Sequence, residues 1–148
     1  MNRLATAQAL FEQNFNCAQS IFSAFANQIA IDPQIALKIA TPFGAGMGRR
    51  GETCGAVTGA LMVIGSFYGN TEASDQDGKE KAYQLARSFC EQFQSRNRSL
   101  VCRQLIGYDI SKEKELNLAR SQRIFADLCP GLVKDAAEIL EELLSSNQ

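Results

Sequence analysis

Residues 54–68 read CGAVTGALMVIGSFY, and this stretch decides the fold. Apolar side chains would cover nearly every face of a helix formed here, so the helix should run through the centre of the core. Gly55 and Gly59, like Ala56 and Ala60, are small residues spaced four apart. Each glycine costs a helix about 1 kcal/mol relative to alanine, so close packing by neighbouring helices must offset that cost.

Helical patterns also lie on both sides of this stretch, because apolar residues recur at spacings of three and four. Asp32-Pro33 is a helix start, and Thr53 is the expected N-cap of the central helix. Cys129-Pro130-Gly131 is expected to interrupt the helical structure. Helical patterns or capping signals cover residues 4–13, 17–29, 33–41, 54–68, 79–94, 100–106, 112–128 and 132–144, some of them short. Since no segment alternates as a strand would, we predict an all-α fold for residues 1–148, a single domain of about six to seven helices.

The composition excludes several classes of function. The chain has 148 residues, of which 45% are hydrophobic and 21% charged, as in ordinary soluble domains. Its formal net charge of -1 argues against a nucleic-acid partner. The absence of histidine excludes Ser-His-Asp and Cys-His catalysis, mixed His/Cys zinc sites and histidine-ligated haem. The five cysteines are therefore the residues of this composition that indicate a specific chemistry.

The expected compartment is the cytoplasm. Residues 1–31 lack the basic start, clean apolar core and cleavage site of a signal peptide. The longest apolar run, residues 55–68, is shorter than the roughly 20 residues of a membrane span, so we expect no transmembrane segment. An odd number of cysteines in a cytoplasmic protein indicates free thiols or metal ligands.

The glycine-rich segment 43–53 contains two patterns that resemble nucleotide-binding loops. Residues 46–51 fit G-x-G-x-x-G, but they follow a helix and a proline instead of a strand. Residues 46–53 fit a Walker A spacing, but Glu52 stands where the phosphate-binding lysine belongs. We therefore interpret the segment as a loop whose backbone approaches its neighbours closely before the central helix begins.

Cys54 is the strongest candidate for a reactive residue. The positive end of the helix dipole favours a thiolate in the first turn, and Arg49 and Arg50 would add to this field, whereas Glu52 would oppose it. The alternative is that Cys54 is a small buried hydrophobe, because free cysteine is among the most buried residue types.

The other cysteines offer weaker patterns. Cys90 and Cys102 lie on either side of the expected turn at 95–99, so a helical hairpin could bring them together for a disulfide or a shared metal. Cys17 and Cys129, taken individually, resemble core residues more than ligands. The chain contains no C-x-x-C, which disfavours zinc ribbons, thioredoxin-like exchange and ferredoxin-type clusters. A four-cysteine metal site assembled from distant helices stays open.

Several segments together resemble the C-GCAxxG-C-C family, which is named from its cysteines and associated with redox activity. The segments are Asn16-Cys17-Ala18-Gln19-Ser20, Cys54-Gly55-Ala56-Val57-Thr58-Gly59-Ala60, Phe89-Cys90-Glu91-Gln92-Phe93 and Cys102-Arg103-Gln104-Leu105-Ile106-Gly107. The resemblance covers essentially the whole chain and extends to Cys129 and the amphipathic helix that follows it. One departure is that the family name reads Gly-Cys-Ala where this chain has Thr53-Cys54-Gly55-Ala56.

The resemblance implies a small helical protein whose cysteines are redox-active or bind a metal cluster. The family cysteines correspond to Cys17, Cys54, Cys90 and Cys102, with Cys129 a fifth. We expect at least three of these four family cysteines to converge.

Three functions follow as hypotheses. The first is a thiol-redox protein, with thiol oxidoreductase activity as the corresponding enzyme class, in which Cys54 attacks and a cysteine on a neighbouring helix resolves the mixed disulfide. The alternative is an iron-sulfur or zinc site with Cys17, Cys54, Cys90 and Cys102 as ligands. The third is a helical interaction module with inert thiols. The redox partner stays open, and a homodimer is compatible with the sequence.

Overall fold

The computed structural model describes residues 2–147 and confirms the all-α prediction. Within these residues the regular structure is helical apart from an isolated antiparallel bridge between Thr53 and Val101. The elements are α1 (Arg3–Glu12), α2 (Cys17–Ala24), α3 (Pro33–Ala40), the 3₁₀ turn η1 (Thr41–Phe43), α4 (Gly44–Met47), α5 (Gly55–Tyr68), α6 (Gln76–Asn97), α7 (Cys102–Ile106), α8 (Glu113–Ser121) and α9 (Ile124–Ser146).

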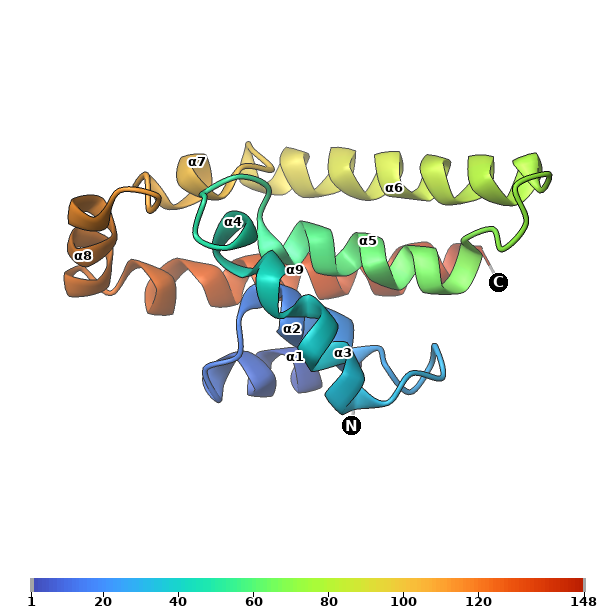
Figure 1. The fold of residues 1–148 in the computed structure, drawn as a ribbon, viewed down its shortest axis with the longest axis horizontal. Coiled ribbons are helices and arrows are strands. Elements are labelled where there is room, and N and C mark those ends of the chain that lie inside the picture. Colours follow the sequence, from blue (N-terminus) through green and yellow to red (C-terminus); the bar gives the residue numbers. More distant parts are fainter. Residues whose placement is uncertain (1, 148) are drawn as a thin grey trace.

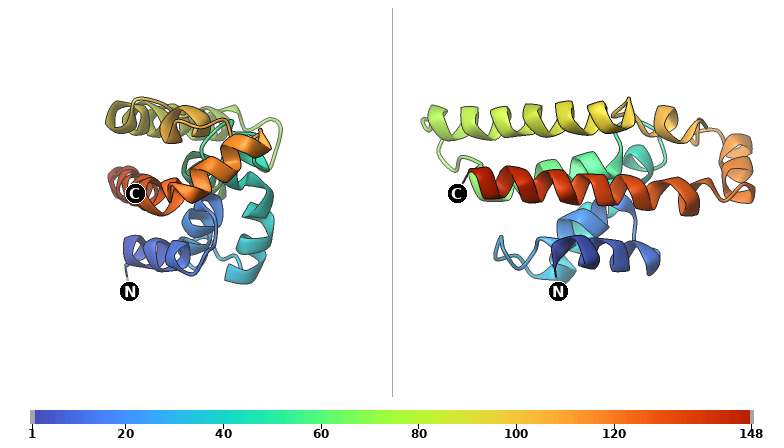
Figure 2. Two further views of the ribbon diagram at one scale, coloured as in Figure 1. Left: turned by 90° about the vertical axis from the view of Figure 1, so that its left-hand side faces the viewer. Right: turned by 180° about the vertical axis from the view of Figure 1, so that it is seen from behind.

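Three long helices set the shape of the molecule. Helices α5, α6 and α9 run along its longest axis, with α6 antiparallel to the other two (Figures 1 and 2). Helices α1, α2 and α3 pack together on one side of this layer, and α7 and α8 lie at one end of it. The starts of α7 and α9 lie toward the end that carries α8, and α5 begins nearer the middle of the long axis.

Helix α5 is central, as its sequence predicts. It contacts α2, α6 and α9, and its first three turns are largely buried. A Cβ added at Gly59 would lie 2.9 Å from the carbonyl oxygen of Ala18, so glycine allows α2 and α5 to pack closely. The last turn emerges from the core, where Gly65 is exposed and a Cβ there would meet nothing within 4 Å.

Side-chain caps define two of the N-terminal helices. The Asp32 carboxylate accepts a hydrogen bond from the Gln34 amide at 2.8 Å, with Pro33 as the first helical residue, which confirms the predicted start of α3. At α2, the Asn16 side chain accepts from the Gln19 amide at 2.9 Å, and the Gln19 side chain accepts from the Asn16 amide at 3.0 Å. This reciprocal capping box fixes Cys17 as the first residue of α2.

The predicted break at residues 129–131 is wrong. Helix α9 continues through Pro130, and the chain instead breaks at Arg123, whose φ of 57° separates α8 from α9. Proline in a helix interior costs about 3 kcal/mol. Burial of the apolar face of α9, which includes Leu132 and Val133, outweighs that cost.

The predicted hairpin between residues 79–94 and 100–106 is also wrong. Helix α6 extends to Asn97, and α7 then continues in the same direction along the molecule (Figures 1 and 2). Ser99 does not cap a helix starting at Leu100; its hydroxyl accepts from the Val101 amide at 3.0 Å. Pairing of Val101 with Thr53 keeps this segment extended, so α7 begins only at Cys102.

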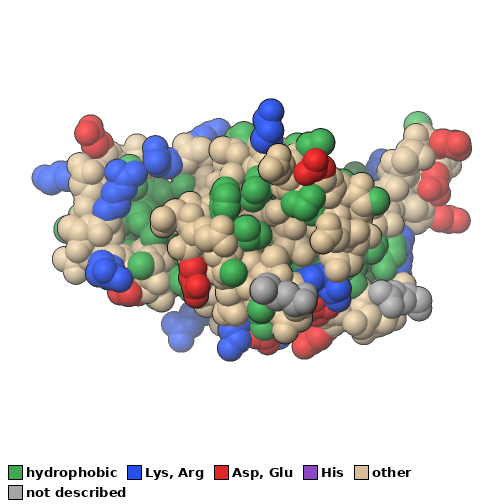
Figure 3. All heavy atoms as spheres, turned by 90° about the horizontal axis from the view of Figure 1, so that it is seen from below, with side chains coloured by type: hydrophobic (Ala, Val, Ile, Leu, Met, Phe, Trp, Pro, Cys, Tyr) green, Lys and Arg blue, Asp and Glu red, His purple; other side chains and the backbone are tan. Residues whose placement is uncertain are grey.

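Two surface properties complete the description. Among the described helices, none has the length and apolar character needed to cross a membrane. Ile35 and Ile39 of α3 are about half exposed, and Figure 3 shows apolar side chains at the surface on the side of the molecule that carries α1 and α3.

Candidate functional site

One pocket of about 480 Å³ gathers cysteines from four separate segments. Cys17 comes from α2, Cys54 from the start of α5, Cys102 from α7 and Cys129 from α9. Each of these four side chains is less than a tenth exposed. Three of the four family cysteines therefore share this pocket, and Cys129 joins them.

Cys54 is the N-cap of α5, not a residue of its first turn, so the prediction of Thr53 as N-cap is wrong. Thr53 is held in the bridge with Val101, and the Cys54 amide donates to the Leu100 carbonyl at 2.8 Å. The Cys54 backbone (φ -55°, ψ 136°) is extended, and helical geometry begins at Gly55. A cap sulfur lies beside the unpaired amides of the helix start.

The same bridge positions Cys102. The Cys102 amide donates to the Glu52 carbonyl at 2.6 Å, which completes the pairing of the two segments. Cys54 and Cys102 directly follow the two bridged residues, and side chains alternate along extended chains, so both lie on the same face of the bridge. The bridge thereby brings two cysteines to one wall of the pocket.

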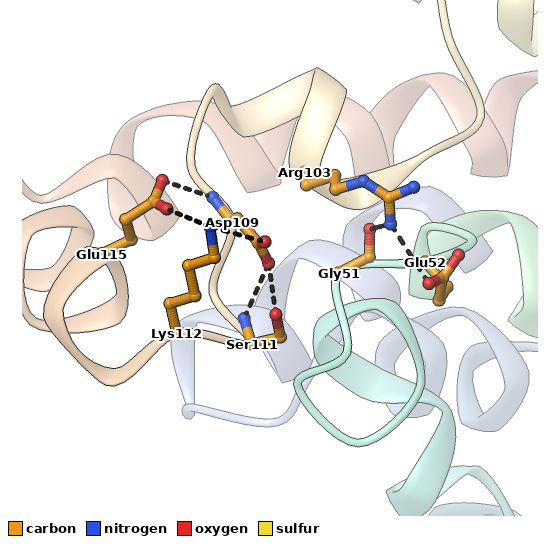
Figure 4. Close-up of polar contacts among 7 residues, drawn as sticks. All are labelled: Gly51, Glu52, Arg103, Asp109, Ser111, Lys112 and Glu115. Carbon is orange, nitrogen blue, oxygen red and sulfur yellow. Dashed lines mark hydrogen bonds and ion pairs between the residues drawn. The ribbon is translucent and has the colours of Figure 1, made fainter.

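Arg103 strengthens this connection from the surface side. Its guanidinium donates to the Gly51 carbonyl at 3.2 Å and lies 3.2 Å from the Glu52 carboxylate (Figure 4). The Arg103 amide also donates to the Gly51 carbonyl at 3.0 Å. In the same view, the Glu115 carboxylate accepts from the Asp109 amide and organises the turn that leads into α8.

Cys129 reaches the pocket because α9 is continuous. Cys129, Leu132, Val133 and Ala136 are all buried, and their spacing of three, four and seven residues places them on one face of α9. This periodicity is the signal that identifies Cys129 as a pocket residue, and the expected helix break at Pro130 concealed it.

The thiols in the pocket influence one another's pKa values. Hydrogen bonding to Cys129, hydrogen bonding to Cys54 and burial together raise the pKa of Cys17 well above its ordinary value. The pKa of Cys54 shifts in the opposite direction. Its lowering is caused first by the hydrogen bond with Cys17, against the effect of burial, and is assisted by the amides of Ala56 and Val57 at the start of α5. The pocket therefore favours the protonated form of Cys17 and the thiolate form of Cys54.

The pKa shift of Cys102 favours its protonated form. Burial, with the nearby Cys54 and Cys129, raises the pKa of Cys102 to about 12, although Arg103 acts in the opposite direction. Arg49 and Arg50, which the sequence suggested as partners of Cys54, are not among the causes of its lowered pKa. Arg49 instead lines a second, smaller pocket.

Cys90 lies apart from the pocket. It is half-buried against the core on α6, and its pKa is raised by burial and by Glu91. Helix α7 does not fold back on α6, so Cys90 and Cys102 are not joined as the expected hairpin would join them. Within residues 2–147, no group of three or more His, Cys, Asp and Glu side chains is arranged to hold a metal ion.

An unusual backbone turn forms another part of the pocket wall. Five consecutive residues, Ala45 to Arg49, have positive φ, although only Gly46 and Gly48 among them are glycine. A Cβ at Gly46 would lie 2.5 Å from the Glu52 amide nitrogen, so this glycine permits the close approach that the sequence predicts. The Glu52 amide donates to the Gly46 carbonyl at 2.9 Å, which ties the turn to the bridge.

Comparison with protein families gives a match over most of the chain. Residues 15–143 match the model of the family described as "Putative redox-active protein (C_GCAxxG_C_C)". The chain belongs to the C_GCAxxG_C_C family. The matched range contains all five cysteines of the chain. Searches of curated proteins and of solved structures find no significant match.

Proposed function

We propose that this family member is a thiol–disulfide redox protein in which Cys54 is the attacking residue and Cys17 the resolving residue. The observation that carries the proposal is that both cysteines line one pocket, where a Cβ added at Gly55, the residue after Cys54, would lie 3.2 Å from the Cys17 Cβ. The thiolate form of cysteine is the nucleophile, and a second cysteine in the same pocket can resolve the mixed disulfide that it forms.

The reaction begins with a disulfide substrate, R–S–S–R. The Cys54 thiolate attacks one sulfur and forms a mixed disulfide, while the first R–S⁻ leaves and takes up a proton. The Cys17 thiolate then attacks the Cys54 sulfur and displaces the second R–S⁻. In total, two protein thiols are oxidised to one disulfide, and the substrate is reduced to two R–SH molecules that carry the two protons.

The coupling between the two cysteines orders these steps. Hydrogen bonding to Cys54 is one of the causes that hold the Cys17 proton. Once Cys54 is bonded to the substrate it is no longer a thiolate, so this cause disappears and Cys17 ionises more readily. The resolving residue is therefore activated by the first step.

Trapping of the mixed disulfide tests the proposal. Reduced protein is mixed with a small disulfide, quenched with acid and mapped by mass spectrometry. We expect a Cys17–Cys54 disulfide in the wild type, a stable adduct on Cys54 in Cys17→Ala, and no rapid reaction in Cys54→Ala. Cys90→Ala is the matched control and should behave as wild type, because Cys90 lies outside the pocket lining. A first adduct on any other cysteine would contradict the assignment.

The metal-binding alternative has a separate test. It requires a ligand set that includes Cys90, whereas Cys129 is the fourth cysteine of the pocket. Protein purified without oxygen should contain well below one equivalent of iron or zinc per chain. One retained equivalent, lost in Cys17→Ala, would favour the metal site over thiol exchange.

A further inference from the structure

The walls of the cysteine pocket are mostly apolar. Aromatic and aliphatic side chains face it from α1, α7 and α9, and examples are Phe11, Leu105 and Phe125. Its volume of about 480 Å³ lies within the range of small-molecule sites, which is about 300–1,000 Å³. Since Cys54 is only 4% exposed, a substrate must enter this pocket to reach its sulfur.

The described lining of the cysteine pocket carries negative charge and no positive charge. Among the described residues that line the pocket, Glu12 at the end of α1 is the only charged side chain. Arg49 and Arg120 belong to the lining of the smaller neighbouring pocket. A carboxylate entering the cysteine pocket would lose water without meeting a basic partner, and transferring an unpaired charge from water is costly.

We propose that the substrates of this site are small disulfides with apolar groups that are uncharged or cationic, and that anionic disulfides are excluded. The inference rests on the proposed function, because the Cys54 sulfur is the atom that reacts. The thiol–disulfide step itself is unchanged: two protein thiols become one disulfide, and the substrate leaves as two thiols. What the pocket adds is selection by charge and polarity.

A pair of probes that differ in charge tests this selection. Dithiobis-nitrobenzoate carries two carboxylates, and its diamide is a neutral disulfide of nearly the same shape. Stopped-flow release of the coloured thiol gives the rate at Cys54 for each probe, with Cys54→Ala providing the background. The same two rates, measured on urea-unfolded protein, give the intrinsic reactivity ratio. We expect the ratio of neutral to anionic rates to be at least tenfold higher in the folded protein.

A charge reversal at the pocket provides the second arm. Glu12→Lys should raise the rate of the anionic probe several-fold relative to that of the neutral diamide. Lysine suits this position at the last residue of α1, since cations are favourable at helix C-termini. Glu80→Lys on the exposed surface of α6 has the same change of net charge and should alter neither rate.

The outcomes separate the two proposals. Equal ratios in folded and unfolded protein would overturn the charge selection, while a Cys17–Cys54 disulfide formed by both probes would leave the proposed function intact. Preference for the neutral probe at Cys54 without a Cys17–Cys54 disulfide would support the pocket selection and contradict the resolving role of Cys17. If neither probe reacts at Cys54, both proposals are wrong.

Discussion

Cys17, the first residue of α2, and Cys54, the N-cap of α5, line the same pocket, and a Cβ added at Gly55 would lie 3.2 Å from the Cys17 Cβ. Both residues are placed by local features of the backbone. The Asn16–Gln19 capping box starts α2 at Cys17, and the bridge to Val101 holds the segment before Cys54 extended. Glycine at positions 55 and 59 then lets the two helices approach closely, so that both cysteines face one pocket.

Cys54 should alkylate first. At about pH 7 a lowered pKa gives a larger thiolate fraction than in an ordinary cysteine with a pKa of about 8.5. Iodoacetamide labelling of reduced protein, followed by mass mapping, should place the first label on Cys54 and a later one on the more exposed Cys90, whose pKa is raised.

The reactivity of Cys54 should depend on Cys17. Cys17→Ala removes the first cause of the lowered Cys54 pKa, so its alkylation at about pH 7 should slow by about three- to tenfold. The midpoint of its rate against pH should move upward in the same variant. Labelling of Cys54 after the other four cysteines would contradict both its thiolate character and its role as attacking residue.

Stability should fall in alkaline solution because of Cys102. Its pKa of about 12 in the folded protein lies above the unfolded value of about 8.5, so the unfolded chain loses its proton first. The stabilising contribution is fully present below about pH 8.5 and is lost as pH rises toward 12, at up to about 1.4 kcal/mol per pH unit. Cys17 contributes in the same direction, and Cys54, whose pKa is lowered, contributes in the opposite one.

Urea unfolding at pH 7.5 and 9.5, with a reductant present, measures this loss. Cys102→Ala should show a smaller decrease between the two pH values than the wild type. Only the difference between pH values is compared, so the cavity left by the substitution cancels. An equal decrease in both proteins would contradict the protonated state of Cys102.

Gly59→Val should destabilise the protein. A Cβ at Gly59 would lie 2.9 Å from the Ala18 carbonyl oxygen and 3.1 Å from the Ile21 Cβ, so a larger side chain must displace α2. Such overpacking costs about 1–3 kcal/mol. Gly65→Ala, on the exposed last turn of the same helix, should instead stabilise it by up to about 1 kcal/mol. Thermal unfolding of both variants measures these opposite effects on stability. If Gly59→Val does not lower the melting temperature, α5 is not packed closely against α2.

The sequence predicts those features that depend on local signals. The continuous apolar run identifies α5 as the central helix, and Asp32-Pro33 marks the start of α3 because the cap and the first helical residue adjoin. Cys17 at the start of α2 and Cys54 at the start of α5 lie in one pocket because these two helices pack against each other. These relationships need only the period of a helix and its capping chemistry.

The features that the sequence did not predict depend on tertiary contacts. Pro130 normally ends a helix, but burial of the following residues keeps α9 continuous and brings Cys129 into the pocket. The bridge between Thr53 and Val101 joins segments 48 residues apart, keeps α7 from folding back on α6 and leaves Cys90 outside. A role of Cys90 in the chemistry stays a prediction.

The turn beside the pocket offers a last pair of substitutions, Gly46→Ala and Gly48→Ala. Both glycines have positive φ, of 66° and 68°, and a side chain in this region costs about 1–2 kcal/mol. At Gly48 this backbone cost is the whole loss of stability, because the nearest atom to the new Cβ, the Pro42 carbonyl oxygen, would be 4.0 Å away. At Gly46 the new Cβ would also lie 2.5 Å from the Glu52 nitrogen and 2.7 Å from Gly51, so backbone must shift and the total cost should reach about 3 kcal/mol or more.

The two variants should also differ at the cysteines. Glu52 donates to the Gly46 carbonyl and accepts from the Cys102 amide, so a shift at residue 46 passes directly into the bridge that positions Cys54 and Cys102. Gly46→Ala should therefore change the alkylation rate of Cys54 several-fold, whereas Gly48→Ala should lower the melting temperature and leave that rate unchanged. Equal alkylation rates in both variants would mean that the turn stabilises the fold without positioning the reactive sulfur.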